Sequence, residues 1–294
     1  MRVFVTGAAG FVGSAVVPEL IGAGHTVLGL ARSDENVAAI RQMGAEPHRG
    51  SLQDLDSLRE GASSTDATIH CAFIHDFANF AESGRIDKLA IEAMGEELVG
   101  TNKAFIVTSG VAGLAQGRPA TEDDLPRPEG VPRVSEQTGL AFAARGVRAM
   151  TVRLPQVHGA PGKCGLVSNL VESARRSGVA AYIGSGSNRW GGAHVLDVAP
   201  VYRLALEKGK AGARYHAVGE EGVPMIEIMQ VVGKQLRLPA KSINPDEAPA
   251  QFGPMAMFVG IDLQGSSVWT QAALGWKPSH IGMIEDISQP GYFS

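Results

Sequence analysis

The stretch RVFVTGAAGFVG at residues 2–13 decides the fold, because it passes from a strand pattern through a glycine-rich turn into a helix pattern. Val3–Thr6 is apolar and rich in strand-forming residues. Gly7 allows a sharp turn, Gly10 lets the backbone approach a ligand, and Gly13 allows close helix-to-sheet packing. Free N–H groups at the start of a helix favour an anion. The stretch therefore predicts a phosphate-binding loop, with a plain strand–turn–helix as the alternative.

Apolar strand patterns alternate with helical patterns along the first half of the chain. The predicted strands are Val3–Thr6, Thr26–Leu30, Ala45–His48, Ala67–Ala72, Ala104–Thr108 and Val147–Leu154. The predicted helices between them are Phe11–Ala23, Asn36–Met43, Asp54–Gly61, Arg85–Val99 and Ser135–Arg145. Such alternation predicts an α/β fold with a doubly wound parallel sheet, as in Rossmann domains.

The pattern changes after the sixth predicted strand. Helices are predicted at Gly162–Arg176, Val195–Leu206 and Pro224–Leu238, with a strand at Arg214–Val218. From Pro239 onward the chain is rich in Pro, Gly, Ser and Met. We expect residues 1–158 and about 190–218 to form the Rossmann domain. We expect about 159–189 and 219–294 to form a smaller, C-terminal substrate-binding lobe.

The composition of the 294-residue chain narrows the classes of function. The formal net charge is −4, which gives no reason to expect a nucleic acid or an anionic membrane as partner. Two cysteines, Cys71 and Cys164, lack metal-ligand spacing, so no metal site and no disulfide framework is expected. No apolar run reaches membrane-spanning length, and the N-terminus lacks a signal-peptide pattern. We therefore expect a cytoplasmic protein.

The end of the second predicted strand bears on which dinucleotide binds. An NAD site uses a carboxylate there to hold the ribose 2′-hydroxyl. Residues 28–33 are LGLARS, which offer Arg32 and Ser33 for a 2′-phosphate instead. This favours NADP(H) over NAD(H). Two alternatives stay open: Arg32 pairs with Asp34 or Glu35, or Asp34 itself reaches the ribose.

Five segments together resemble one enzyme family: the glycine loop at 7–13, IHCA at 69–72, VRLPQVHG at 152–159, NRW at 188–190 with HVLDVA at 194–199, and LGWKP at 274–278. The chain resembles the extended and atypical short-chain dehydrogenase/reductases, which include NAD-dependent epimerases and dehydratases. The resemblance implies cofactor contacts at Gly7, Gly10, Phe11, Val12, Gly13, Arg32, Ser33, Cys71, Ala72, Phe73, Thr108, Pro155, Val157 and His158. It implies substrate contacts at Ser109, Gly110, Val111, Arg189, Trp190 and His194, although Arg189 could instead pair with Asp197 and Trp190 could belong to the core.

The catalytic residues of that family are missing from the expected positions. The family uses a Tyr and a Lys four residues apart, and these positions fall near Pro128 and Pro132. No lysine occurs between residues 104 and 162. The usual serine falls on Gly110, with Ser109 and Thr108 beside it.

Candidate catalytic groups are therefore Ser109, Asp87, His158 and His75. The resemblance places Asp87 where the family has an Asn of its proton relay; the alternative is a solvated carboxylate that pairs with Lys88 or Arg85. Either histidine could donate a proton to the substrate near pH 7; the alternative is an ordinary loop histidine bonded to the backbone. Arg133 falls near the missing Lys, though an Arg at a helix start is usually solvated.

The family resemblance and the missing Tyr/Lys pair together leave three possible functions. The first is an NADP(H)-dependent oxidoreductase that reduces a carbonyl or oxidises an alcohol of a small or medium organic substrate. The second is an NADP(H)-binding sensor or scaffold without turnover. The third is a nucleotide-sugar epimerase or dehydratase, ranked lower because those enzymes rely on the Tyr/Lys pair. The predicted helices at Arg85–Val99 and Ser135–Arg145 resemble the helices through which family members form homodimers. The alternative is that their apolar positions are buried inside a single chain.

Overall fold

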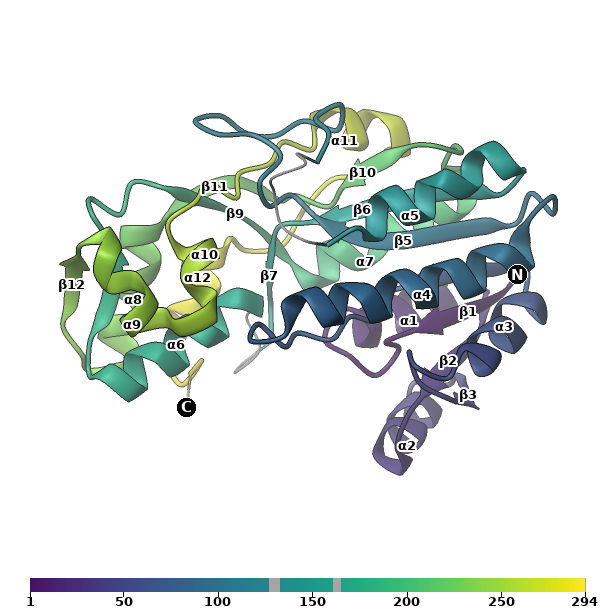
Figure 1. The fold of residues 1–294 in the computed structure, drawn as a ribbon, viewed down its shortest axis with the longest axis horizontal. Coiled ribbons are helices and arrows are strands. Elements are labelled where there is room, and N and C mark those ends of the chain that lie inside the picture. The colour runs from purple at the N-terminus through teal and green to yellow at the C-terminus, as the bar shows by residue number, and fades with distance from the viewer. Residues whose placement is uncertain (127–132, 161–164, 294) are drawn as a thin grey trace.

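A seven-stranded parallel sheet forms the centre of the larger of two bodies, which lies on the right in Figure 1. The computed structural model describes residues 1–126, 133–160 and 165–293. The strand order is β10-β6-β5-β4-β1-β2-β3, and every neighbouring pair is parallel. The strands are β1 (Arg2–Thr6), β2 (Thr26–Ala31), β3 (Glu46–Arg49), β4 (Ala67–His70), β5 (Ala104–Gly110), β6 (Arg148–Leu154) and β10 (Arg214–His216). The predicted α/β class with a doubly wound parallel sheet is confirmed.

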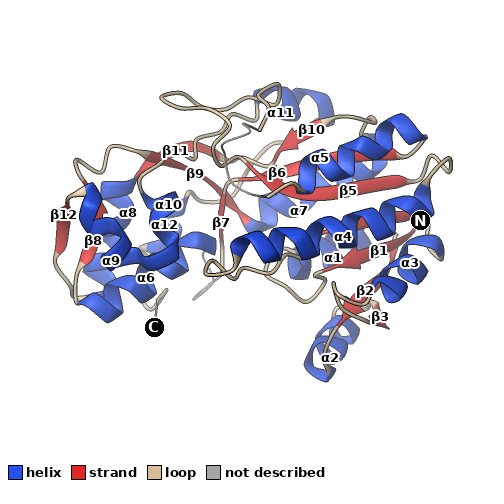
Figure 2. Ribbon diagram, viewed as in Figure 1, coloured by secondary structure: helices blue, strands red, loops and turns tan. Residues whose placement is uncertain are grey.

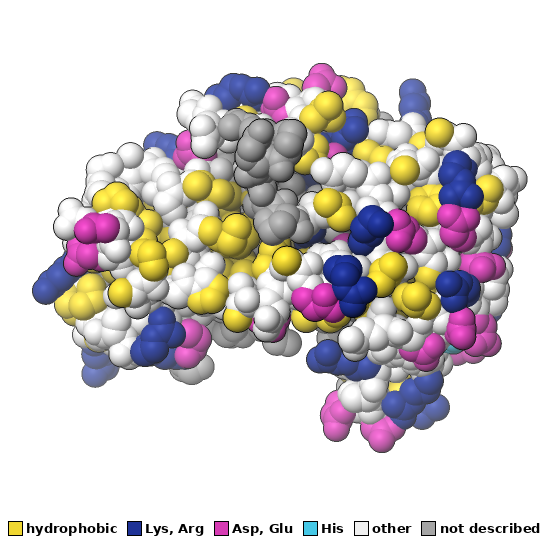
Figure 3. Space-filling view, in the orientation of Figure 1, with side chains coloured by type: hydrophobic (Ala, Val, Ile, Leu, Met, Phe, Trp, Pro, Cys, Tyr) yellow, Lys and Arg dark blue, Asp and Glu magenta, His cyan; other side chains and the backbone are white. Residues whose placement is uncertain are grey.

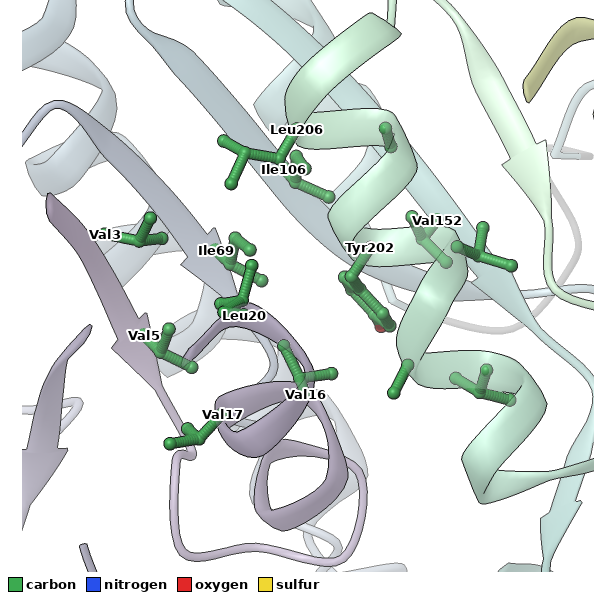
Figure 4. Packing of buried hydrophobic residues seen from close by; sticks show 14 of the residues in the cluster. Val3, Val5, Val16, Val17, Leu20, Ile69, Ile106, Val152, Tyr202 and Leu206 are labelled. Carbon is green, nitrogen blue, oxygen red and sulfur yellow. The ribbon is translucent and has the colours of Figure 1, made fainter. Parts of the chain in front are cut away.

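Helices cover both faces of this sheet (Figure 2). On one face, α1 (Gly13–Gly22) and α7 (Val195–Lys208) pack side by side. Figure 4 shows their side chains meeting those of the strands in one apolar core, with Val16, Leu20 and Tyr202 facing residues such as Val5 and Ile69. On the opposite face, a second apolar cluster joins residues of α3 (Leu55–Ser63) and α4 (Phe80–Leu98) to strand residues such as Phe4 and Phe105.

Two more helical segments flank the sheet, α2 (Asp34–Gln42) and α5 (Ser135–Ala141), the latter continued by η1 (Phe142–Arg145). The predicted strand 67–72 ends earlier, at His70, because residues 71–76 leave the sheet at its carboxyl edge. The predicted helix from Arg85 begins at Phe80, five residues before the predicted start. Its first turn carries Phe80, which packs against a further apolar core that includes Trp190 and Phe258.

The remaining elements form a second body beside the carboxyl edge of the sheet. Its strands make two small sheets, β11-β9-β7 and β12-β8. The strands are β7 (Gln156–His158), β8 (Ala180–Ile183), β9 (Arg189–His194), β11 (Glu220–Pro224) and β12 (Ala240–Ile243). Its helices are α6 (Gly165–Ser177), α8 (Met225–Leu236), η2 (Pro245–Glu247), α9 (Ala248–Phe252), η3 (Gly253–Met255), α10 (Ala256–Val259) and α12 (Met283–Ile287). The exception is α11 (Val268–Leu274), which packs against α7 and contributes Leu274 to the core of the large sheet.

This second body has an apolar core of its own, which includes Trp190, Met225, Phe252 and Phe258. The five strands outside the large sheet were absent from the sequence prediction. They are three to six residues long, and their pairing joins segments far apart in sequence, such as β12 with β8. Within the described residues, no helix combines the length and apolar character needed to cross a bilayer.

Candidate functional site

A cleft of about 820 Å³ opens at the carboxyl edge of the large sheet, where ligands of open α/β sheets bind. Its wall includes residues that follow β1, β2, β4, β5 and β6. The second body closes its far side with side chains such as Leu166, Phe258 and Leu263. The cleft therefore lies between the sheet edge and the second body.

The glycine loop lines one end of this cleft in a conformation that needs its glycines. Gly7 has a φ of +67°, and a Cβ there would lie 2.8 Å from the backbone nitrogen of Ala72. A Cβ on Gly13 would lie 2.0 Å from the carbonyl oxygen of Gly7. The N–H groups of Phe11 and Val12 donate to no acceptor among the described residues. The loop thus keeps backbone donors available at the start of α1, as a diphosphate requires.

Arg32 extends this end of the cleft beyond β2. Its side chain is exposed and lines the cleft, and no ion pair of Arg32 occurs within the described part of the chain. Asp34, the expected competitor, pairs with Arg49 instead. Ser33 accepts a hydrogen bond from the backbone N–H of Asn36 at 3.3 Å and caps α2. A guanidinium without a carboxylate partner therefore stands at the end of β2.

The floor of the cleft is formed by groups at the ends of β4 and β5. The hydroxyls of Thr108 and Tyr202 lie 2.8 Å apart, and Tyr202 is fully buried. Desolvation by burial raises the pKa of the nearby Cys71 thiol to about 12. Cys71 is therefore a protonated thiol in the cleft wall and a poor nucleophile.

Arg133 reaches the cleft from the residues that precede α5. Its Nε donates to Ser135 Oγ at 2.7 Å, and its Nη2 donates to the carbonyl oxygen of Thr108 at 2.9 Å. Its guanidinium lies 4.0 Å from the ring centroid of Phe73. Desolvation lowers the pKa of Arg133 from its usual value, which the Asp87 charge partly offsets. No pattern in the sequence identifies this site, because Phe73 and Thr108 are distant along the chain.

Asp87 lies behind Arg133 in a buried network. It is 1% exposed, lies 3.0 Å from His70 Nε2 through Oδ1, and accepts a hydrogen bond from Ser135 Oγ. His70 Nδ1 in turn lies 2.7 Å from the hydroxyl of Thr6. Burial acts to raise the pKa of Asp87, but the hydrogen bond and charge of His70, with the charge of Arg133, hold it below its usual range. Asp87 is thus a buried carboxylate and pairs with neither Lys88 nor Arg85.

His75 stands at the rim of the cleft beyond β4. Its ring contacts Phe73 with 5.2 Å between centroids and Phe77 with 6.3 Å. Desolvation by these neighbours, followed by the Arg133 charge, lowers the pKa of His75 from its usual value. The imidazole is therefore neutral at pH 7, although part of its surface reaches solvent.

Most of the residues named from the sequence line the cleft. These are Gly7, Gly10, Phe11, Val12, Gly13, Arg32, Cys71, Ala72, Phe73, His75, Thr108, Ser109, Gly110, Val111, Pro155 and Val157. The cleft wall does not include Ser33, Asp87, His158, Arg189, Trp190 or His194. Pro128, Pro132 and Cys164 lie outside the described residues.

The residues away from the cleft have structural partners. His158 is 1% exposed, and its Nδ1 lies 2.9 Å from Asp286. Trp190 is fully buried in the apolar core of the second body. His194 caps α7 and stacks on His280 at 4.6 Å between centroids. Arg189 donates to the carbonyl oxygen of Gly222 at 3.0 Å and does not pair with Asp197.

Comparisons with known proteins agree with this architecture. The model of the NAD dependent epimerase/dehydratase family matches residues 3–218. An uncharacterized protein of Schizosaccharomyces pombe is 46% identical over 100% of both chains. A 4-hydroxy-2-methyl-3-oxo-4-farnesyl-3,4-dihydroquinoline-1-oxide ketoreductase of Stigmatella aurantiaca is 28% identical over 76% of this chain and 70% of its own. The solved structure of MoeE5 in complex with UDP-glucose and NAD has a TM-score of 0.78 at 23% identity, covering 100% of this chain and 98% of that one, which shows a shared fold.

Proposed function

This chain belongs to the NAD dependent epimerase/dehydratase family, and we propose that it is an NADP(H)-dependent oxidoreductase acting on a carbonyl or alcohol without the Tyr/Lys pair. The observation that carries the proposal is the cleft, which combines the glycine loop, the unpaired Arg32 and a polar floor at the end of β5. We also propose that residues 1–158 and about 190–218 hold the cofactor and that the remainder shapes the substrate site. The apolar core of the second body supports a separate substrate lobe, with two exceptions: Trp190 packs in that core, and Trp276 packs in the core of the large sheet.

The cleft residues fit a phosphorylated dinucleotide. Backbone N–H groups at Phe11 and Val12 would hold the diphosphate, and Arg32 would neutralise a 2′-phosphate. The bound reduced cofactor would supply a hydride to the substrate carbon. Ser109 and His75 lie in the cleft wall and would orient the substrate oxygen, while Asp87 and His158 are too buried to touch substrate.

The proposal is tested by turnover together with binding. Purified protein is mixed with NADPH and a panel of aldehydes and ketones, and loss of NADPH absorbance is followed. We expect NADPH-dependent reduction of at least one class of carbonyl compound. Tight binding of NADPH by calorimetry, with no reduction across a broad panel, would instead favour the sensor without turnover, which the missing Tyr/Lys pair motivates.

A charge reversal at Arg32 tests the cofactor preference. In Arg32→Glu the guanidinium that would meet the 2′-phosphate becomes a carboxylate, which repels that phosphate and suits a ribose hydroxyl. We expect the Kd of NADP⁺ to rise about 10- to 100-fold, the cost of one charge-assisted hydrogen bond, while the Kd of NAD⁺ stays the same or falls. Calorimetric titrations with both dinucleotides measure this, and Arg41→Glu, at an exposed position of helix α2, is the matched control. Equal effects on the two cofactors would refute the role of Arg32.

A further inference from the structure

Four phenylalanine side chains, Phe73, Phe77, Phe80 and Phe258, form what we call the aromatic wall of the cleft. Phe77 and Phe80 stack with 5.8 Å between centroids, and Phe258 meets them at 5.8 and 6.0 Å. Phe73 meets Phe80 at 5.5 Å. The first three lie between β4 and the start of α4, and Phe258 comes from α10, so both bodies build the wall. On the face drawn in Figure 3, hydrophobic side chains are most crowded just left of the middle. A wall of aromatic rings in a cleft binds apolar groups.

The charged residues of the cleft argue against a diphosphate in the part that the aromatic wall lines. Arg32 and Arg133 are the charged residues of its described wall, which contains no Asp, Glu or Lys. Arg32 belongs to the end with the glycine loop, which leaves Arg133 as the cation near the aromatic wall. A buried diphosphate needs several cationic or N–H partners to offset its desolvation. The wall therefore suits an uncharged carbon skeleton.

Arg133 has one nitrogen left for a ligand. Nε and Nη2 are bonded to Ser135 and to the carbonyl of Thr108, whereas Nη1 donates to no described residue. The Thr108 bond sets the guanidinium beside Ser109, the next residue of β5 and part of the cleft wall. An acceptor oxygen that enters the cleft along the aromatic wall would thus meet a cationic N–H.

We propose that the substrate is an apolar ketone or aldehyde whose carbonyl oxygen accepts a hydrogen bond from Arg133 and whose carbon skeleton packs on the aromatic wall. This inference rests on the proposed function and names its substrate class. The carbonyl carbon gains the hydride and a C–H bond as the dinucleotide is oxidised, the π electron pair moves to oxygen, and a proton from water completes the alcohol. Arg133 stabilises the negative charge that develops on the oxygen, the role of an oxyanion-binding donor.

The buried network holds Arg133 in place. Ser135 Oγ accepts from Arg133 and donates to Asp87, whose other oxygen lies against His70. The Asp87 carboxylate also offsets the guanidinium charge in a partly desolvated position. Asp87 is therefore a positioning residue that acts through Ser135 and Arg133.

The binding mode is tested by the infrared carbonyl stretch of 2-acetylnaphthalene, labelled with carbon-13 at the carbonyl. It is bound to protein saturated with NADP⁺, so that no reduction occurs. We expect the stretch in the wild type to lie at lower wavenumber than for the ketone in an apolar solvent, because a cationic donor polarises the bond. Arg133→Met should abolish this shift. Arg145→Met is the matched control, since Arg145 also lies over a phenylalanine ring, at 5.2 Å, outside the cleft.

Two further variants test the wall and the network. Phe77→Ala should raise the Kd of the ketone about 10- to 100-fold, which corresponds to the free energy of burying one aromatic side chain against the ligand. The Kd of NADP⁺ should not change. Trp269→Ala, an exposed aromatic side chain outside the cleft, is its control. Asp87→Asn should return the stretch partly toward the solvent value, an effect that loss of stability alone would not produce.

The outcomes separate this inference from the proposed function. Failure of NADP⁺ to bind would remove the proposed function itself. With NADP⁺ bound, the inference is overturned by an equal carbonyl stretch in wild type and Arg133→Met, by absence of ketone binding, or by tighter binding of UDP-glucose than of the ketone. A loss of NADP⁺ affinity in Arg133→Met without a change in the stretch would assign Arg133 to the cofactor and also overturn it.

Discussion

Gly13→Ala is expected to abolish measurable binding of NADP⁺. The added Cβ would lie 2.0 Å from the carbonyl oxygen of Gly7 and 2.9 Å from the Cα of Ala8, so the loop must move. Both obstacles are backbone atoms, which cannot rotate away as a side chain could. Loss of two N–H bonds to the diphosphate corresponds to an increase in Kd of about 100-fold or more. Calorimetric titration with NADP⁺ measures the change.

The same helix supplies the control for this substitution. A Cβ on Gly22, the last residue of α1, meets nothing within 4 Å. Gly22→Ala should therefore bind NADP⁺ as the wild type does. Circular dichroism of both variants shows whether the fold is retained. Wild-type affinity in a folded Gly13→Ala protein would rule out the glycine loop as the diphosphate site.

Glu136→Gln is expected to cause a large loss of stability, because Glu136 is a buried carboxylate that pairs with two arginines. Glu136 accepts two hydrogen bonds from Arg153, both at 2.7 Å, and one from Arg214 at 2.8 Å. Arg153 is fully buried, so the variant leaves a guanidinium without its counter-charge. Breaking a buried ion pair on one side costs about 3–5 kcal/mol. Urea unfolding followed by circular dichroism measures the free energy of unfolding.

An exposed pair provides the comparison. Glu96 pairs with Arg145 through side chains that are 54% and 46% exposed. Because solvent screens such a pair, Glu96→Gln should leave the free energy of unfolding nearly unchanged. If both variants unfold at the same urea concentration as the wild type, the buried pair contributes no net stability.

The sheet and the glycine loop were predictable because their signals are local. Val3–Thr6 shows the strand pattern directly, and the glycines of the loop follow within seven residues of its end. The family resemblance named Ala72 and Ser109, and both line the cleft because parallel pairing brings the ends of β1, β4 and β5 to one edge. The expected homodimer and the expected cytoplasmic location of the protein stay predictions, because neither follows from local sequence signals.

The chemical groups of the cleft were decided by tertiary packing. His158 follows β6 in sequence, but its ring lies against Asp286, which is 128 residues away in the chain. His158 is therefore not part of the cleft wall. Asp87 sits on a helix with charged neighbours, but α4 is rotated so that this carboxylate meets His70 and Ser135.

The sequence by itself therefore determined the class of the large sheet, the order of its strands and helices along the chain, and the position of the glycine loop between β1 and α1. Only the tertiary structure decided that Arg133 and the aromatic wall face the cleft, while Asp87, His158 and Trp190 lie elsewhere. The physical reason is the sequence separation over which each signal acts. Strand and helix patterns repeat every two or about four residues, whereas a side chain's partner depends on how distant segments pack.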